Sequence, residues 1–594
     1  MKKFVFLIIG LLLLIPIVYA KQGHMKLLAV AETEEGYKGG IAELYLEVKQ
    51  GSGRVFLETF PLTKVDTQVS TRFAKEIACD FADADCDKYD FFYTITADSS
   101  IIAGPSAGAA ISVLTFSLIK NVEFDENTAI TGTINSGGLI GPVGALNAKI
   151  EAASKAGLKK VLIPVGELTT INKSYGKNTS INTGTNESTD LNELRAKYNL
   201  DVKEVPALDD AIFEFTGKRF REKKANITIS QDYVDTMKML AVQLCSRSTK
   251  LKQEISAAKN NKTKSVFENA INLSNIGKDS FNNNMYYSSA SYCFGANVEF
   301  NYLLLLQQNL TKEEAIKKVN ALREEIKNFT ENLENLDVKT ITDIETYMIV
   351  KERLTEASDF LDIVIVPLNN LNDNWNNKNE SLRNLAYAIE RLNSAYSWFT
   401  FFGSEGKKFD FNGGVIRNAC KSKLSEVEER LQYVQLYLPQ NLASTRKELN
   451  YAYKDLNDSN YELCLFRASK AKANVDAILS LLGIKNENVH ILIKQKLDVV
   501  ERNLVEQIEK GIFPILGYSY FEYATSLKDS DQFSALLYAE YALELSNLDI
   551  YFKDEKQIFT KIDVKLWVVF IIGISIGFIA AEISKRGKKR SKRL

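Results

Sequence analysis

The sequence predicts an α+β domain near the N-terminus, an all-α helical bundle or solenoid-like region after it, and one transmembrane helix near the C-terminus. Residues 25–217 mix strand and helix patterns, whereas residues 226–560 carry apolar residues at helical spacing and few prolines. Residues 564–584 are mostly apolar and long enough to cross a bilayer. At 594 residues the chain is also too long for a single core.

Both ends of the chain indicate a membrane protein. Lys2 and Lys3, then the apolar run Phe4–Val18 and a small residue at Ala20, are typical of a signal peptide over residues 1–20. An uncleaved signal anchor is the alternative. The basic tail, residues 585–594, follows the predicted spanning helix directly, as expected on the cytoplasmic side. We therefore expect a single-pass protein of the cell membrane, with residues 21–562 outside the cytoplasm.

Cysteine usage and charge fit such a location. The 6 cysteines are an even number and fall into neighbouring pairs, which predicts disulfides in an oxidising compartment. The pairs are Cys79/Cys86, Cys245/Cys293 and Cys420/Cys464. Buried free thiols are the alternative. A formal net charge of −1 gives no support for nucleic-acid binding, so no nucleic-acid partner is expected.

The α+β domain is expected to contain three strand segments, four helices and one exposed loop at residues 169–190. The first strand segment is a hairpin of Ala42–Val48 with Arg54–Thr59 around a Gly-Ser-Gly turn, and the others are Tyr89–Thr96 and Lys160–Pro164. The first helix could be capped by Asp66 and runs to about Phe81. The other three are Ala107–Ile119, Ala145–Ala156 and Ala207–Phe215. The charged residues 218–224 are either a linker or a solvated helix start.

Residues 226–560 are expected to form helical hairpins stacked in the bundle or solenoid. Alanines at Ala468 and Ala471, and again at Ala539 and Ala542, follow aromatic residues and suggest a weak tetratricopeptide-like repeat. Close packing at helix crossings is the simpler explanation of these alanines.

Histidine-dependent chemistry is hard to build in this chain. It holds 2 histidines, His24 beside the predicted cleavage site and His490 far away in a helical stretch. A histidine triad or a histidine-rich zinc site is therefore not expected, and neither a metal nor a cofactor is predicted. Ser106, in Gly104-Pro105-Ser106-Ala107-Gly108 at the start of an apolar helix, is a candidate nucleophile close to free N–H groups. Taken alone, this turn could equally be a helix cap.

A serine nucleophile needs a base, and lysine is the natural candidate where histidine is lacking, provided that burial leaves the amine neutral. Lys149 lies among small residues from Gly144 to Ala153 on a predicted helix. The alternative is a lysine whose amine reaches solvent from an amphipathic helix.

Several motifs in one register then resemble a known family. Ala103–Pro164 is similar to the proteolytic domain of Lon proteases, most closely the archaeal membrane-bound branch. The serine pentapeptide resembles the Lon nucleophile motif, and the step from 106 to 149 equals the Lon serine-to-lysine spacing. Further segments match in the same register: Ile130-Thr131-Gly132, Pro142–Leu146, Ala148–Ala153 and Ala156–Pro164.

This resemblance implies that Ser106 is the nucleophile, Lys149 the general base and Thr131 the hydroxyl that orients the amine, with backbone N–H groups near Ser106 as the oxyanion hole. The chain departs from the family at Ala103, where Lon proteins usually have an acid, and at Ala145 and Asn147. It also has no Gly-x-x-x-x-Gly-Lys-Ser/Thr motif for an ATPase.

The resulting expectation is an ATP-independent serine endopeptidase, similar to secreted archaeal proteases with a Lon-type domain, that acts on extracytoplasmic polypeptides. A catalytically inactive Lon-fold protein with a binding or envelope role is the alternative. Because burying a lysine is costly, its retention in register with the serine and threonine favours the enzyme. The resemblance also implies a homo-oligomer, a hexamer by analogy with Lon rings.

Overall fold

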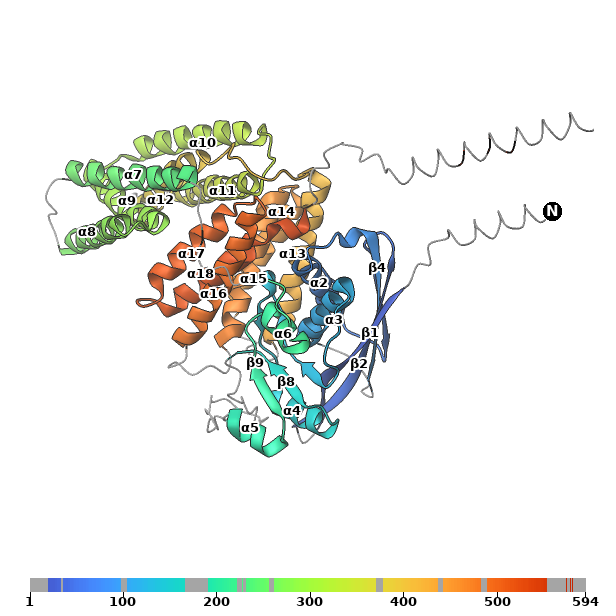
Figure 1. Cartoon of the computed structure of the whole chain (residues 1–594). Coiled ribbons are helices and arrows are strands. Elements are labelled where there is room, and N and C mark those ends of the chain that lie inside the picture. Colours follow the sequence, from blue (N-terminus) through green and yellow to red (C-terminus); the bar gives the residue numbers. More distant parts are fainter. Residues whose placement is uncertain are drawn as a thin grey trace, which may run out of the picture. The chain divides into compact units, whose positions relative to one another are not determined.

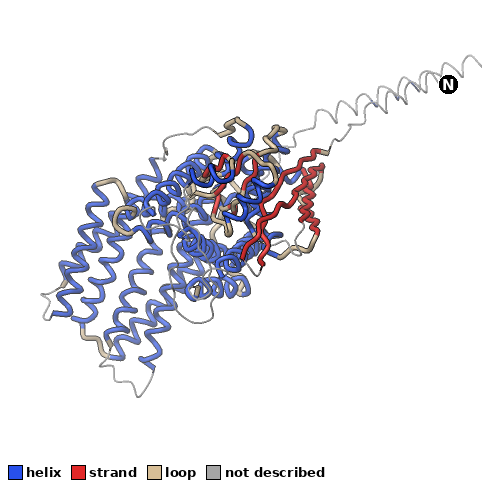
Figure 2. Tube along the Cα trace, turned by 90° about the horizontal axis from the view of Figure 1, so that it is seen from below, coloured by secondary structure: helices blue, strands red, loops and turns tan. Residues whose placement is uncertain are grey.

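The computed structural model describes residues 20–33, 36–97, 104–165, 191–221, 227, 231–255, 261–369, 378–435, 442–481 and 489–552, with Gly573, Gly577 and Ala580 beyond them. The described residues up to Phe552 belong to one compact unit, and the last three belong to a second. Figures 1 and 2 show the strands of the first unit gathered on one side and the long helices that follow residue 231 extending away to the other side.

A four-stranded sheet opens the chain. Its order is β1 (Lys21–Thr33), β2 (Gly36–Gln50), β4 (Tyr89–Ala97) and β3 (Val55–Phe60), and only the β3–β4 pair is parallel. Helices α2 (Val65–Phe81) and α3 (Gly108–Lys120) pack against each other, and α3 also contacts β1 and β2. The inward side chains of β4 are almost fully buried beneath these helices, so the sheet and the two helices share one core.

The predicted hairpin between β2 and β3 is wrong, because β4 lies between them and pairs with both. Asp90 at the start of β4 accepts hydrogen bonds from the N–H groups of Ser52 (2.8 Å) and Arg54 (3.0 Å). These bonds hold the Gly-Ser-Gly turn across the end of β4. The pKa of the Asp90 carboxyl is lowered to about 2. The largest cause is the side-chain hydrogen bond from Arg54, and the backbone hydrogen bonds of the turn and the positive charge of the guanidinium act in the same direction. The true hairpin is β1–β2, a pair that the sequence patterns did not reveal.

A second, parallel sheet has the order β5 (Thr128–Ile130), β8 (Lys160–Ile163) and β9 (Asp201–Glu204). Helices α4 (Leu146–Lys155) and α5 (Leu191–Tyr198) belong to this part, and the short ladder of β6 (Thr133–Ile134) with β7 (Ile140–Gly141) lies between β5 and α4 in sequence. Helix α6 (Leu208–Thr216) ends at Gly217, which has φ 68°. Apart from the hairpin and the cap of the first helix, the predicted strands and helices of this region are confirmed. The predicted loop at 169–190 lies outside the described residues.

The all-α prediction for the rest of the unit is confirmed. Consecutive helices such as α8 and α9, α11 and α12, and α17 and α18 pack against each other. Local signals set several ends: Thr311 accepts a hydrogen bond from the N–H of Glu314 in a capping box at the start of α10. The helices are α7 (Gln231–Glu254), α8 (Asn261–Asn282), α9 (Tyr286–Gln308), α10 (Lys312–Glu334), α11 (Ile341–Asn369), α12 (Asn379–Phe399), α13 (Gly413–Gln435), α14 (Ala443–Asn457), α15 (Tyr461–Leu481), α16 (Val489–Glu509), α17 (Ile515–Leu527) and α18 (Gln532–Ser546).

The helical region packs directly on the α+β part. Leu139 and Ala207 belong to the same apolar core as residues of α7 to α18. Of the charged segment 218–224, residues 218–221 are described and contain no helix. Arg221 forms an ion pair with Glu506 of α16, lies 3.5 Å from Asp80 of α2, and covers the ring of Phe81 at 3.7 Å. This end of the segment therefore joins the two regions closely.

All three predicted disulfides are present: Cys79–Cys86, Cys245–Cys293 and Cys420–Cys464. Across the part of the chain that the structure describes, no helix combines the length and the apolar character needed to span a membrane. The predicted signal peptide, residues 1–20, lies outside that part except for Ala20. The basic tail at 585–594 also lies outside the described part. The same holds for the predicted spanning helix at 564–584, except for Gly573, Gly577 and Ala580.

Candidate active site

The predicted nucleophile lies on a tight turn at the start of α3. Ser106 is the middle residue of the 3-10 turn η2 (Pro105–Ala107), which leads directly into the helix, and it is half-buried. Gly104, just before the turn, has φ 102° and ψ 149°, a conformation that favours glycine. The turn therefore puts the serine beside the N-terminus of a buried helix, the end at which a helix carries free N–H groups.

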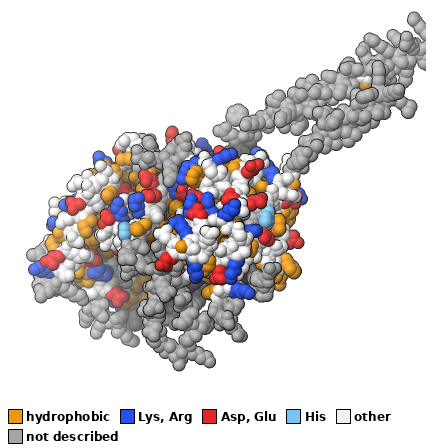
Figure 3. Space-filling model, turned by 60° about the horizontal axis from the view of Figure 1, so that its bottom comes forward, with side chains coloured by type: hydrophobic (Ala, Val, Ile, Leu, Met, Phe, Trp, Pro, Cys, Tyr) orange, Lys and Arg blue, Asp and Glu red, His pale blue; other side chains and the backbone are white. Residues whose placement is uncertain are grey.

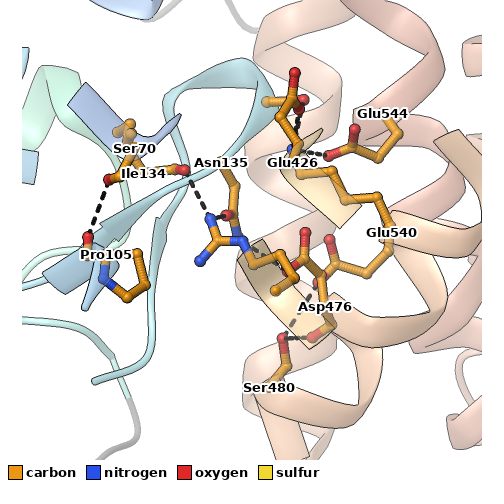
Figure 4. A network of polar contacts seen from close by, with 12 residues as sticks. Ser70, Pro105, Ile134, Asn135, Glu426, Asp476, Ser480, Glu540 and Glu544 are labelled. Atoms are coloured by element: carbon orange, nitrogen blue, oxygen red, sulfur yellow. Dashed lines mark hydrogen bonds and ion pairs between the residues drawn. The ribbon is translucent and has the colours of Figure 1, made fainter. Parts of the chain in front are cut away.

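Helix α2 fastens this turn from the side. The carboxylate of Asp66 accepts a hydrogen bond from the N–H of Gly104 (3.1 Å), and the hydroxyl of Ser70 donates to the carbonyl oxygen of Pro105 (3.3 Å; Figure 4). Asp66 was predicted to cap α2, but it lies in the first turn of the helix and the N-cap residue is Lys64. That part of the prediction is wrong, since the carboxylate binds its neighbour Thr67 and the serine turn.

The predicted base is buried on α4. Leu146, Ile150 and Ala153 of α4 enter the core of the parallel sheet, and Lys149 on the same helix is 2% exposed. The helix begins after Ala145, which has φ 55° and ψ 42°. A lysine that reached solvent would not be so deeply buried, so the snorkelling alternative does not describe this residue.

The side chain of Thr131 contacts the amine of Lys149. The Nζ of Lys149 donates a hydrogen bond to Oγ1 of Thr131 at 3.0 Å, and Thr131 is itself 1% exposed. The N–H of Thr131 donates to the carbonyl oxygen of Leu162 in β8 (3.1 Å), which holds the threonine backbone beside the parallel sheet. A fixed acceptor of this kind restricts the position of the lysine amine.

The residue after Thr131 joins this pair to the serine turn. The N–H of Gly132 donates to the carbonyl oxygen of Ser106 (3.0 Å), and the carbonyl oxygen of Gly132 accepts from the N–H of Ala109 (3.0 Å). A side chain at Gly132 would be excluded, because its Cβ would lie 2.5 Å from Cγ2 of Ile140. The structure thus brings the segments of Ser106, Thr131 and Lys149 together around one short stretch of chain.

The structure describes two of the three positions at which the chain departs from the Lon motifs. Ala103 lies outside the described residues. Ala145 occupies the left-handed region, where glycine is accommodated at lower cost than alanine. A glycine is common in Lon proteins at this position, and the backbone conformation gives a physical reason for it. The third departure, Asn147, lies in the first turn of α4.

The helical region also touches the segment that follows Thr131. Arg430 of α13 donates to the carbonyl oxygen of Ile134 (2.8 Å) and to the side-chain oxygen of Asn135, and it is 3% exposed. Lys472 of α15 lies 3.5 Å from the hydroxyl of Ser136. Figure 4 shows Ile134 and Asn135 facing this group of helical side chains. The sequence offered no local signal for these contacts, because Arg430 is 296 positions from Ile134.

Behind these contacts lies a buried network of ion pairs. Lys423 and Lys472 each bridge Glu426 and Glu544, with N···O distances of 2.8 to 3.2 Å. Burial would raise the pKa of Glu544, but the two lysines outweigh it and lower the pKa to about 2. Burial dominates for Glu429 and raises its pKa to about 7, despite the neighbouring Arg430. The network therefore holds a mixture of firmly ionised and weakly acidic carboxyl groups.

Two further features concern potential metal ligands among the described residues and the surface charge on one face of the molecule. Within the described ranges, no group of three or more histidine, cysteine, aspartate or glutamate side chains could hold a metal ion. On the face drawn in Figure 3, basic and acidic side chains are interspersed.

One part of the chain is similar to a known family. Residues 75–182 match the family model of the Lon protease (S16) C-terminal proteolytic domain. The chain carries a Lon proteolytic domain. The matched segment includes Ser106, Thr131 and Lys149, whereas Asp66 and Ser70 precede it and Arg430 lies far beyond it.

Curated relatives are similar to part of the chain. A Lon protease of Methanosphaera stadtmanae is 27% identical over 172 residues, covering 28% of this chain and 18% of that protein. Lon protease 2 of Bacillus subtilis is 46% identical over 63 residues, 11% of each chain. An archaeal Lon protease of Archaeoglobus fulgidus is 43% identical over 63 residues, 11% of this chain and 10% of that one. The chain thus spans less than a fifth of the length of these relatives.

Proposed function

We propose that this protein is an ATP-independent serine endopeptidase in which Ser106 is the nucleophile, Lys149 the general base and Thr131 the group that orients the amine. The observation that carries the proposal is the placement of Lys149. Its buried amine lies 3.0 Å from Oγ1 of Thr131, while the adjoining Gly132 is hydrogen-bonded to the backbone of Ser106.

The reaction follows from these roles. Oγ of Ser106 attacks the carbonyl carbon of a peptide bond, and its proton passes to the neutral amine of Lys149. Backbone N–H groups near Ser106 stabilise the negative oxygen of the tetrahedral intermediate. The lysine then gives its proton to the leaving amine, so that the C–N bond breaks and an acyl-enzyme forms. A water molecule, deprotonated by the same lysine, attacks the ester carbonyl and releases the new carboxyl group and Ser106.

The proposed location and independence from ATP rest on the sequence. The apolar segments at 1–20 and 564–584 and the basic tail support a body outside the cytoplasm, anchored by one helix. Three disulfides fit an oxidising compartment. The sequence contains no phosphate-binding loop of the Gly-x-x-x-x-Gly-Lys-Ser/Thr type. Extracytoplasmic polypeptides are the substrates that this combination favours.

The test is cleavage of an unfolded protein by the full chain and by matched variants. Ser106→Ala and Lys149→Arg should both abolish cleavage, because arginine stays protonated and cannot accept the serine proton. Lys155→Arg is the control: this lysine lies on the same helix, is 75% exposed and pairs with Glu151 in solvent, so activity should be unchanged. The wild-type protein and the Lys155→Arg control are expected to cleave the substrate without added ATP.

Thr131→Val tests the orienting hydroxyl separately. It keeps the shape of the side chain but removes the acceptor of the 3.0 Å bond, and a bond of this type contributes about 1–3 kcal/mol. The expected loss in kcat/KM is on the order of ten- to a hundredfold, while Thr131→Ser should retain most of the activity. A folded Lys149→Arg protein that cuts at the wild-type rate would refute the dyad. A wild-type protein that cuts nothing would favour the inactive binding protein instead.

A further inference from the structure

The helical region contains a second candidate site, distinct from the Lon domain. A cavity of about 310 Å³ is lined by residues of α7, α9, α11, α12, α15, α17 and α18. None of its lining residues belongs to residues 75–182. Its volume is at the lower end of the range for pockets that bind small molecules.

One part of the cavity wall is aromatic. Tyr287, Trp398, Tyr520 and Tyr541 line it and are each less than a tenth exposed, and Tyr538 adds a further ring. The rings of Tyr287 and Tyr520 lie 5.9 Å apart, and those of Tyr538 and Tyr541 5.5 Å apart. Such a wall favours an apolar or aromatic group in the cavity.

The other part of the wall is charged, and its side chains carry a net charge of one positive unit. Three basic side chains, Arg353, Arg391 and Lys470, line the cavity together with two acidic ones, Glu352 and Glu356. Lys470 lies 2.7 Å from Glu352, and Nε of Arg391 lies 2.7 Å from Glu356. A ligand with one negative charge would balance the set.

Arg353 has unused hydrogen-bonding capacity at this wall. Its Nη1 lies 3.3 Å from Glu352 and 3.6 Å from Glu356. Its Nε is buried and has no hydrogen-bond partner among the residues that the structure describes. A buried donor without an acceptor is costly, and a carboxylate is the acceptor that the planar guanidinium fits best in shape and charge.

We propose that this cavity binds the carboxyl-terminal end of a polypeptide, with the terminal carboxylate at Arg353 and an apolar or aromatic last side chain among the tyrosine and tryptophan rings. The ligand class rests on the proposed function, since hydrolysis of a peptide bond creates a new carboxyl terminus. A small inorganic anion would leave the aromatic wall uncovered, and an uncharged apolar ligand would leave the Arg353 donor unpaired. The cavity volume limits the bound part to the last one or two residues.

The test is peptide binding to the full chain carrying Ser106→Ala, so that cleavage plays no part. The chain has 3 tryptophans, and with Trp375→Phe and Trp567→Phe only Trp398, in the cavity wall, reports by fluorescence. The probes are Gly-Gly-Gly-Gly-Phe as the free acid, the same peptide with an amidated C-terminus, and inorganic phosphate. The acid should bind saturably and at least about tenfold more tightly than the amide, because only the acid offers a charged acceptor.

Arg353→Lys should weaken binding of the acid about tenfold or more, since lysine keeps the charge but lacks the planar donors. Arg323→Lys, on α10 and paired with Asp362 outside the cavity, is the matched control and should bind like the parent. Equal affinity for acid and amide, or binding of phosphate but of neither peptide, would overturn the proposal. The acid–amide comparison uses the native cavity wall, so it does not depend on the folding of a variant. Peptide binding by a protein that proves inactive would refute only the proposed enzyme.

Discussion

Gly39→Ala is expected to disturb the candidate active site through the packing of α4 on β2. Gly39 lies in β2 opposite Val30 of β1, and α4 packs closely against this strand. A Cβ at this position would lie 1.9 Å from the carbonyl oxygen of Ala148 and 2.6 Å from its carbonyl carbon. Ala148 directly precedes Lys149, so the clash falls on the backbone that carries the proposed base.

The size of the expected loss in stability and activity follows from the short distance between the added Cβ and the carbonyl oxygen of Ala148. To pass from 1.9 Å to the 3.4 Å of ordinary van der Waals contact, the strand and the helix must separate by about 1.5 Å. Overpacking of a well-packed core costs about 1–3 kcal/mol in unfolding free energy. A displacement of about 1 Å at a catalytic group can cost on the order of a hundredfold in rate. We therefore expect both a less stable protein and a kcat/KM reduced by about that factor.

The neighbouring Gly40 provides the control. A Cβ added at Gly40 would meet nothing within 4 Å, so Gly40→Ala should leave stability and activity close to those of the wild type. The measurements are urea unfolding followed by circular dichroism and peptide cleavage under conditions in which both variants are folded. A folded Gly39→Ala protein with wild-type stability and cleavage rate would refute the reasoning, because α4 would then not need the close approach.

Three further predictions concern stability, each measured by urea unfolding. Ala145→Gly should raise the unfolding free energy by up to about 1 kcal/mol, because alanine has φ 55° there; a loss of stability would contradict this. Glu429 has a pKa of about 7 in the folded protein against an ordinary 4.5, so the unfolded chain ionises first and stability falls as pH rises between these values. Glu429→Gln should remove the contribution of this group, so that the loss of stability between pH 4 and pH 8 becomes smaller by up to about 3 kcal/mol, and an unchanged loss would argue against it. Replacing Cys79 and Cys86 together by serine should cost about 2 kcal/mol in the chain-entropy model, whereas no loss would show that the crosslink is not stabilising.

Local patterns in the sequence were sufficient for much of the fold, and together with the family resemblance they supplied the candidate residues of the site. Helical spacing of apolar residues predicted the all-α region, because a helix must bury one face whatever it packs against. The serine turn and the lysine helix were recognisable because their chemistry depends on a few adjacent residues. Proximity in sequence also paired the cysteines correctly, since each bond joins neighbouring cysteines along the chain.

Interactions between distant segments were decided only by the tertiary structure. Strand β4 enters between β2 and β3 because its buried face and both edges find partners there, and a turn signal at Gly51–Gly53 cannot reveal such an insertion. Asp66 looked like a helix cap, yet its carboxylate binds the N–H of Gly104 beside Ser106. Arg430 reaches the segment after Thr131 from the other end of the chain. In each case the partner is chosen by three-dimensional packing, so the sequence determined the candidate groups, and the fold determined which of them meet.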